Sequence, residues 1–151
     1  MPQKQRGGRT VNEAGFEALR DPNGAVRSDI DAHDYVVGLP IAQVVRELAG
    51  LLGATTVAVI GGVKETRAVA QWMTDREPQR PHVLRFALQI ALMLTSRRDR
   101  EFTQAWFNAA NPRLGDRIPM LLLRDVPLSE IQHPLLDAAR GFAARNERAT
   151  G

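Results

Sequence analysis

Apolar residues recur at helical spacing along most of the chain from residue 39 onward. Between Pro40 and Gly53 they stand three or four positions apart, and Pro40 suits the first turn of a helix because it lacks an N–H. The same periodicity predicts further helices over residues 57–60, 65–75, 82–96, 99–110, 120–124 and 134–145. The segment 82–96 is apolar nearly all round, so we expect it at the centre of the core. No segment alternates convincingly with a period of two, and the predicted fold class is all-α.

The first 38 residues are more polar and are predicted to form an N-terminal extension that is partly disordered. Residues 1–10 are rich in Gly and Arg, and residues 12–19 have the pattern of a short helix. Around His33 the chain is acidic, and we expect a loop there. The spacing of these acids fits no metal-ligand pattern, so no metal site is predicted. After this extension, the chain is predicted to divide into two helical regions, residues 39–98 and residues 99–151.

Composition narrows the class of protein. With 151 residues, 44% of them apolar, the chain is long enough for one domain with a hydrophobic core. No run approaches the roughly 20 apolar residues of a membrane span, and no apolar stretch follows the basic N-terminus as it would in a signal peptide. The absence of cysteine excludes disulfides and thiolate metal sites. These features favour a cytoplasmic protein.

The net charge of +3 is unevenly distributed. Residues 64–100 carry eight Lys or Arg against four Asp or Glu, whereas the rest of the chain is nearly balanced. A local basic surface is the footprint expected of phosphate contacts. A solvated helix face would produce the same count, so charge alone leaves both interpretations open.

The segment 51–72 has the pattern of a helix-turn-helix. Ala58 is the small residue that a first helix needs, Gly61 and Gly62 allow a tight turn, and Trp72 is an inward anchor for the second helix. The candidate DNA-contacting residues are polar side chains at the start of the second helix and two arginines that follow it: Lys64, Thr66, Arg67, Gln71, Arg76 and Arg80. Glycine turns also join packed helices that never touch DNA, so the pattern predicts the fold more specifically than the binding.

A second motif lies between Ala105 and Arg124. Each of its parts has a local explanation: a Trp that suits core packing as well as binding, an Asn-Pro pair that ends a helix, a Gly that allows positive φ, and a Pro that starts the next helix. The motif consists of Trp106, Asn111-Pro112, Leu114-Gly115, Arg117, Pro119 and Leu122-Leu123. As a set, these residues resemble the toxin-binding domain of Xre/MbcA/ParS-type antitoxins, and residues 62–85 look like the helix-turn-helix of that family. The resemblance covers about residues 40–145, with Asp116 where the family more usually has glycine.

The resemblance implies a partner and a site. Toxins of this family have the RES fold and consume NAD, and the antitoxin covers the toxin's active site, partly with its C-terminal region. The implied toxin-binding residues are Trp106, Asn111, Pro112, Leu114, Gly115, Arg117 and Pro119, with Arg140, Arg145, Asn146 and Arg148 on the last helix. The apolar face of that helix suits either the antitoxin's own core or the toxin. Such antitoxins commonly dimerise and repress their own promoter, so a homodimer or a larger complex with the toxin is expected.

Catalytic groups do not converge in the sequence. His33, His82 and His133 are scattered, and Gly61-Gly62-Val63-Lys64 lacks the spacing of a phosphate-binding loop. We therefore predict a non-enzymatic protein without a cofactor: the antitoxin of a type II toxin–antitoxin system, whose DNA binding would regulate its own operon. The alternatives are a stand-alone helix-turn-helix regulator without a toxin and a protein-interaction module whose helix-turn-helix is vestigial.

Overall fold

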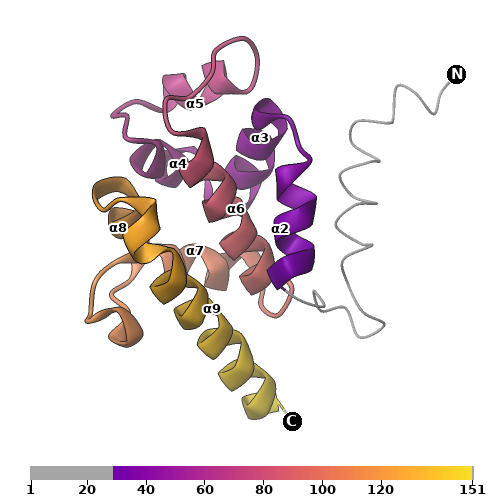
Figure 1. Cartoon of the computed structure of the whole chain (residues 1–151), viewed down its shortest axis with the longest axis vertical. Coiled ribbons are helices and arrows are strands. Elements are labelled where there is room, and N and C mark those ends of the chain that lie inside the picture. Colours follow the sequence, from indigo (N-terminus) through magenta and orange to yellow (C-terminus); the bar gives the residue numbers. More distant parts are fainter. Residues whose placement is uncertain (1–28, 151) are drawn as a thin grey trace, which may run out of the picture.

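The computed structural model of the chain describes residues 29–150, with side chains described over residues 31–142. This part contains eight α-helices, one 3-10 helix and no β-strand, which confirms the all-α prediction (Figure 1). The elements are α2 (Asp29–Val37), α3 (Ile41–Leu52), α4 (Ala54–Gly61), α5 (Thr66–Trp72), α6 (Pro81–Thr95), α7 (Arg100–Asn108), η1 (Pro112–Leu114), α8 (Pro119–Asp125) and α9 (Leu128–Thr150). The helix expected over residues 12–19 and the mobile end over residues 1–10 fall outside the described residues.

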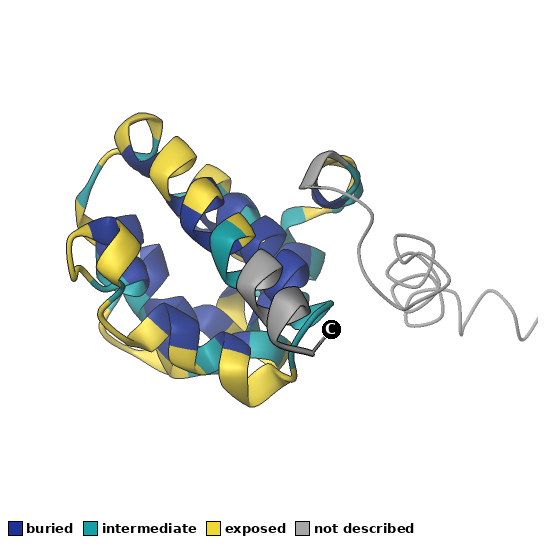
Figure 2. Ribbon diagram, turned by 90° about the horizontal axis from the view of Figure 1, so that it is seen from below, coloured by how far each residue is buried: buried dark blue, intermediate teal, exposed yellow. Residues whose placement is uncertain are grey.

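Helix α6 forms the centre of the molecule, as its apolar sequence predicted. Pro81 takes the first helical position, and every residue from Phe86 to Leu94 is buried. Helices α2, α3, α4, α7 and α9 all contact α6. A helix that is apolar on all sides needs neighbours on all sides, and Figures 1 and 2 show the surrounding helices with their buried faces turned toward it.

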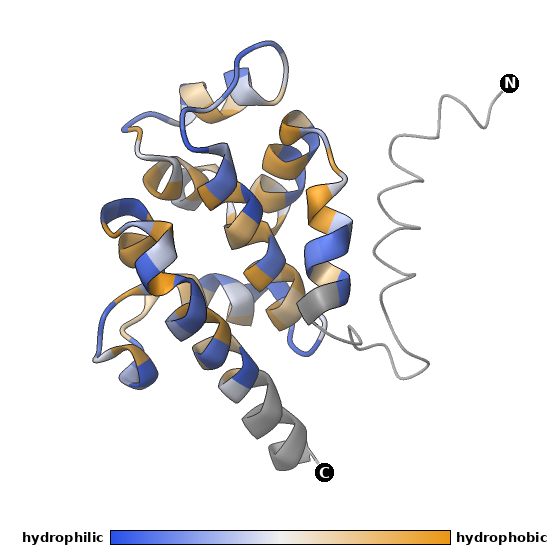
Figure 3. Cartoon of the chain, in the orientation of Figure 1, coloured by the Kyte–Doolittle hydropathy of each residue, from blue (hydrophilic) through white to orange (hydrophobic). Residues whose placement is uncertain are grey.

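The described helices share one hydrophobic core. It extends from Ala32 in α2 to Ala139 in α9 without interruption. Helix α2 contacts α6 across the expected boundary after residue 38, and α3 contacts α7 and α6 contacts α9 across the boundary after residue 98, so neither boundary separates independent cores. Figure 3 shows that helices from all three predicted regions carry apolar residues.

The acidic stretch around His33 is the helix α2 and not a loop, contrary to the sequence prediction. Ala32 and Val36 lie one turn apart, are buried, and belong to the core that α6 occupies. Arg85 of α6 donates through Nη1 to the carbonyl oxygens of Val36 (3.0 Å) and Leu39 (2.7 Å), at the end of α2. Two buried residues among the seven of α2 whose side chains are described produce a weak periodicity, and the contacts with α6 supply the stability that the local pattern lacks.

The last helix begins at Leu128, six residues before the predicted start at Pro134. Pro134 lies inside α9, where the absence of its N–H removes one helical hydrogen bond and usually costs about 3 kcal/mol. Ile131 and Leu135 are both buried on the same face, one turn apart across the proline. Continuous burial of this face offsets the lost bond, and that burial is not visible in the local sequence.

The start of α4 also differs from the prediction. Thr55 or Thr56 was expected to cap a helix over residues 57–60, but α4 begins at Ala54, directly after Gly53. Gly53 has a φ of 88°, which turns the chain sharply between α3 and α4. The Gly53 carbonyl accepts the N–H of Val57 at 3.2 Å, so the helical hydrogen bonds start before either threonine.

Candidate binding surfaces

Helices α4 and α5, which are the two helices of the predicted helix-turn-helix, pack against each other across a short turn. Gly62 has a φ of 82° and ends α4 in the left-handed conformation. Its N–H donates to Val59 O (3.0 Å), and the N–H of Val63 donates to Ala58 O (2.9 Å), which is the Schellman pattern. The turn glycine is therefore required by backbone geometry, as the sequence predicted.

Gly61 is required for a different reason. A Cβ added at Gly61 would lie 2.6 Å from Cη2 of Trp72, so only the absence of a side chain lets the α5 indole approach α4. Trp72 is buried, and Val69 beside it is fully buried. Both are the inward anchors that the pattern predicted for the second helix.

The outward side of α5 carries the predicted DNA-contacting residues, which the structure brings onto one exposed segment. All five of its predicted polar side chains are exposed: Lys64, Thr66, Arg67, Gln71 and Arg76. Three acidic residues alternate with the three cations over residues 64–77, and Glu65 lies 3.5 Å from Arg67. This segment therefore offers hydrogen-bonding groups but no net positive charge.

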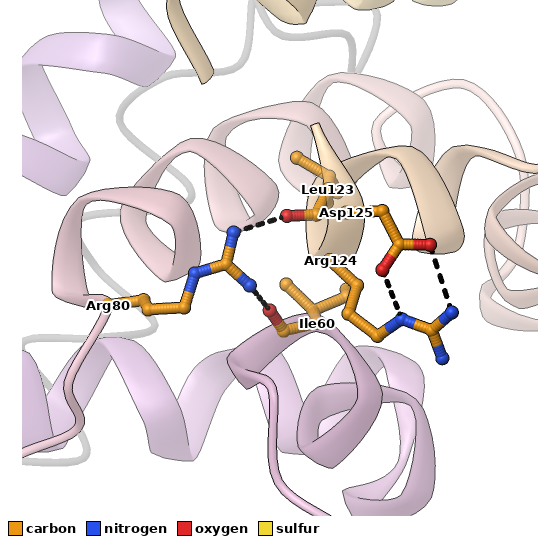
Figure 4. A network of polar contacts seen from close by, with 5 residues as sticks. All are labelled: Ile60, Arg80, Leu123, Arg124 and Asp125. Carbon is orange, nitrogen blue, oxygen red and sulfur yellow. Dashed lines mark hydrogen bonds and ion pairs between the residues drawn. The ribbon is translucent and has the colours of Figure 1, made fainter. Parts of the chain in front are cut away.

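Arg80 does not belong to this exposed set, and its prediction as a phosphate-gripping residue is corrected. Its Nη1 donates to Ile60 O (3.0 Å) and its Nη2 to Leu123 O (2.8 Å), so its guanidinium joins the ends of α4 and α8 (Figure 4). Nearby, Arg124 forms two hydrogen bonds with Asp125, at 2.6 and 2.9 Å. Hydrogen bonding from Arg124 lowers the pKa of Asp125, and the charge of Arg80 lowers it further.

Several of the arginines that make residues 64–100 basic bind backbone carbonyls, as Arg80 does. Arg80, Arg85 and Arg100 each donate to backbone carbonyls near the end of a helix other than their own. Carbonyls in the last turn of a helix generally lack partners within the helix, and a cation also suits the negative end of the helix dipole. The carbonyls belong to Ile60 and Leu123 for Arg80, Val36 and Leu39 for Arg85, and Gly50 for Arg100.

The Asn111–Pro119 loop is built around one asparagine. The Asn111 N–H donates to Arg117 O (3.0 Å), and its carbonyl accepts from the N–H groups of Leu114 and Asp116, each at 2.9 Å. Its side-chain Oδ1 accepts from Arg113 N at 2.9 Å. Gly115 follows η1 with a φ of 66°, which confirms the predicted need for glycine. The loop is thus fastened by its own hydrogen bonds.

The structure divides the predicted toxin-binding residues of this region into two groups. Trp106, Leu114 and Pro119 are buried, so their assignment to direct toxin contact is corrected. Pro112, Gly115 and Arg117 are exposed, and Asn111 is half-buried. The Arg117 guanidinium, which had no predicted partner, donates through Nε to Leu114 O at 3.1 Å.

The loop rests on α9 through a residue that sequence reasoning missed. The Arg113 guanidinium lies against the α9 backbone at Gly141, where an added Cβ would be 2.6 Å from Arg113 Nε. A glycine inside a helical pattern was the available signal, since it often marks close approach. Arg140, on the same helix, is exposed and pairs with Asp137 at 3.1 Å. Arg145, Asn146 and Arg148 lie beyond the described side chains.

A hollow of about 390 Å³ opens beside the loop, along α8. Its lining is mostly apolar with charged residues among it: Asp116, Arg117, Ile118, Leu121, Leu122, Asp125 and Val126. Leu122 was part of the recognised motif, whereas the other lining residues of α8 were not singled out from the sequence. A partly apolar depression beside a fixed loop is a suitable place for a protein partner's side chain.

Comparisons of the chain with protein families, curated proteins and solved structures gave no match. Within residues 29–150, no helix is both long enough and apolar enough to cross a membrane. Among the described residues, no three His, Asp or Glu side chains gather closely enough to hold a metal ion. His33, the histidine of the acidic stretch, lies 3.3 Å through Nδ1 from Oε1 of Gln89.

Proposed function

We propose that this protein is the antitoxin of a type II toxin–antitoxin system, and that it binds and blocks a RES-type toxin that consumes NAD. One observation carries the proposal: the motif that resembles the toxin-binding domain forms an exposed loop held by its own hydrogen bonds and seated on α9. A preorganised loop binds without the entropic cost of ordering itself. The proposal includes action in the cytoplasm, without catalysis or a cofactor.

In this proposal, exposed loop residues touch the toxin and buried ones hold the loop in place. Pro112, Gly115 and Arg117 supply contact surface, while Trp106 and Leu114 anchor the loop to the core. Helix α9 continues past the body of the domain, which suits a C-terminal segment that reaches a partner (Figure 1). Assembly as a homodimer or as a larger complex with the toxin is part of the same proposal.

The test is co-expression with the toxin gene expected beside this one. A tagged antitoxin should co-purify with the toxin and restore growth of cells that express it. The variant Asn111→Ala with Arg117→Ala should lose most of this rescue, because it removes the side-chain bond that orders the loop and one exposed cation. Asn108→Ala is the matched control, since Asn108 is exposed on α7 and, among the described residues, its side chain bonds only to Gln104 O, at 2.7 Å. A wild-type protein that neither co-purifies nor rescues growth would show that the proposal is wrong.

Promoter binding through α5 is the second candidate function, favoured by the exposed polar face of a helix packed across a glycine turn. Lys64→Ala with Arg67→Ala should weaken binding to the protein's own promoter and leave toxin neutralisation intact. Each lost phosphate contact should lower the salt slope by about one unit. Unchanged DNA affinity in the double variant would show that α5 does not contact the promoter. A wild-type protein without salt-dependent promoter binding would favour the interaction module over both regulators.

A further inference from the structure

The hollow along α8 has an apolar floor that the rest of the chain leaves partly open. Ile118, Leu121 and Val126 are only half-buried, and they line the hollow together with the buried Leu122. The hollow's volume of about 390 Å³ lies in the range of pockets that hold a compact ligand group. It adjoins the Asn111–Pro119 loop, so a partner that covers the loop would also reach the hollow.

A carboxylate without a partner stands at the rim of this floor. Asp116 is exposed, and no hydrogen bond or ion pair joins its side chain to any of the described residues. It is also the one non-glycine residue in the described part with positive φ, at 63°. A side chain in that conformation is less favourable than glycine, so the fold gains nothing local from this aspartate.

The other charges at the rim are already engaged. Asp125 is bonded to Arg124 by two hydrogen bonds, and Arg117 is tied back to the loop carbonyl of Leu114. Asp116 is therefore the charged group lining the hollow whose side chain has no hydrogen bond or ion pair with the described residues. An apolar floor next to an unpaired carboxylate is complementary to a side chain with a long aliphatic stem and a cationic head.

We propose that the hollow along α8 receives an arginine or lysine side chain of the toxin, with its stem on Ile118, Leu121 and Val126 and its head on the Asp116 carboxylate. This inference rests on the proposed antitoxin function and names the chemistry of the partner at that site. It assigns Asp116 a binding role that explains why a strained position carries a carboxylate.

The test uses the full-length protein and the purified toxin encoded beside it, with binding measured by calorimetry at two salt concentrations. Asp116→Asn keeps the size and tolerance of positive φ but removes the charge, and Asp116→Gly also relieves the backbone. Both should bind about tenfold more weakly and show a smaller salt dependence, while Asp116→Gly melts at the same or a higher temperature. Leu121→Gln, which makes the floor polar, should also weaken binding by about fivefold. Glu77→Gln, an exposed carboxylate that does not line the hollow, should bind within about twofold of wild type.

Two results would overturn the inference while the antitoxin function stands. The first is wild-type affinity in Asp116→Asn when the wild-type protein itself binds the toxin. The second is weakened binding by both Asp116 variants with full affinity in Leu121→Gln, which would place the carboxylate contact outside the hollow. If the wild-type protein does not bind the toxin, the proposed function fails and this inference fails with it.

Discussion

Arginine side chains in this protein connect helices that are distant in the sequence. Arg80 follows α5, and its two guanidinium nitrogens bind Ile60 O at the end of α4 and Leu123 O at the end of α8. A planar guanidinium can serve two carbonyls at once, which a lysine ammonium on a flexible stem does less well. One side chain therefore joins the predicted DNA-reading helix pair to the helix that follows the candidate toxin-binding loop.

Replacing this arginine should lower the free energy of unfolding. We expect Arg80→Ala to lose about 2–3 kcal/mol, because two hydrogen bonds from a charged, half-buried donor disappear and two helix-end carbonyls lose their partner. Arg80→Lys should recover only part of this loss. Urea unfolding measures both, with the exposed Arg76→Ala expected within about 0.5 kcal/mol of wild type. If Arg80→Ala and Arg76→Ala change the free energy of unfolding equally, Arg80 does not stabilise the protein by joining α4 to α8.

A second residue-scale feature is the half-buried Glu47, which joins α3 to α2. Tyr35 Oη donates to Glu47 Oε2 at 2.9 Å, and Gln43 Nε2 donates to the same oxygen at 3.3 Å. Burial raises the pKa of Glu47, and the hydrogen bonds from Tyr35 and Gln43 only partly oppose this rise. Burial, followed by the bond to Glu47, raises the pKa of Tyr35 above its ordinary range.

The raised pKa of Glu47 makes a pH-dependent prediction. The folded state holds this proton more tightly than the unfolded state, so the stabilising effect is complete below the ordinary glutamate pKa of about 4.3 and is lost as pH rises through the folded value. Glu47→Gln should therefore be more stable than wild type at about pH 8, and the difference should vanish below about pH 4. Chemical unfolding across this range, with Glu77→Gln as an exposed control, measures the effect. A gain that does not change with pH would point to a cause other than ionisation.

At the scale of elements, two glycines in neighbouring helices have opposite roles. Gly61 ends α4 against the Trp72 ring, where an added Cβ would meet Cη2 at 2.6 Å and Cζ3 at 2.8 Å. Gly50 lies in α3, and outside the adjoining backbone of its own helix no atom of the described residues comes within 4 Å of the position its Cβ would take. Steric approach therefore decides the first position, whereas only the entropic cost of glycine in a helix acts at the second.

This difference predicts opposite signs for the same substitution. Gly61→Ala should destabilise the protein by about 1–3 kcal/mol, because either the indole or the helix must move. Gly50→Ala should stabilise it by up to about 1 kcal/mol through helix propensity. Thermal unfolding of the two variants side by side tests the prediction, and a loss of stability in both would mean that α3 also has a neighbour at Gly50.

At the scale of the whole molecule, α9 belongs to the core along its first half. Leu135 and Ala139 are fully buried, and Leu136 is 8% exposed. The apolar face of this helix, which the sequence allowed to dock on either the core or a toxin, therefore lies on the core. Phe142, further along, is half-buried and faces the guanidinium of Arg98 at 5.8 Å.

Two truncations separate the structural part of α9 from its end. Removal of residues 134–151 exposes the core and takes away two large buried leucines, worth about 3–6 kcal/mol, which approaches the whole stability of a small domain. We expect that protein to melt much earlier or not to fold. A cut after Arg145 spares the described core face, so the melting temperature should stay the same while toxin neutralisation weakens. Full neutralisation by the shorter protein would transfer the inhibitory role to the Asn111–Pro119 loop alone.

The sequence by itself determined the features that depend on neighbouring residues. The apolar run of α6 required burial, Pro119 marked a helix start, and Gly62 and Gly115 marked turns with positive φ. Each follows from a constraint carried within a few residues, such as a missing N–H or a missing Cβ. These features were enough for the all-α class, the paired helices α4 and α5, and the position of the candidate loop.

Only the tertiary structure decided which residues meet across the chain. It turned the acidic segment into α2, extended α9 back through Pro134, and buried Trp106, which was expected at the toxin-binding surface. It also took Arg80 away from the solvent side and placed it between two helix ends. The physical reason is common to all four: burial and long-range hydrogen bonds depend on which surfaces approach one another, and that approach is a property of the whole packed core.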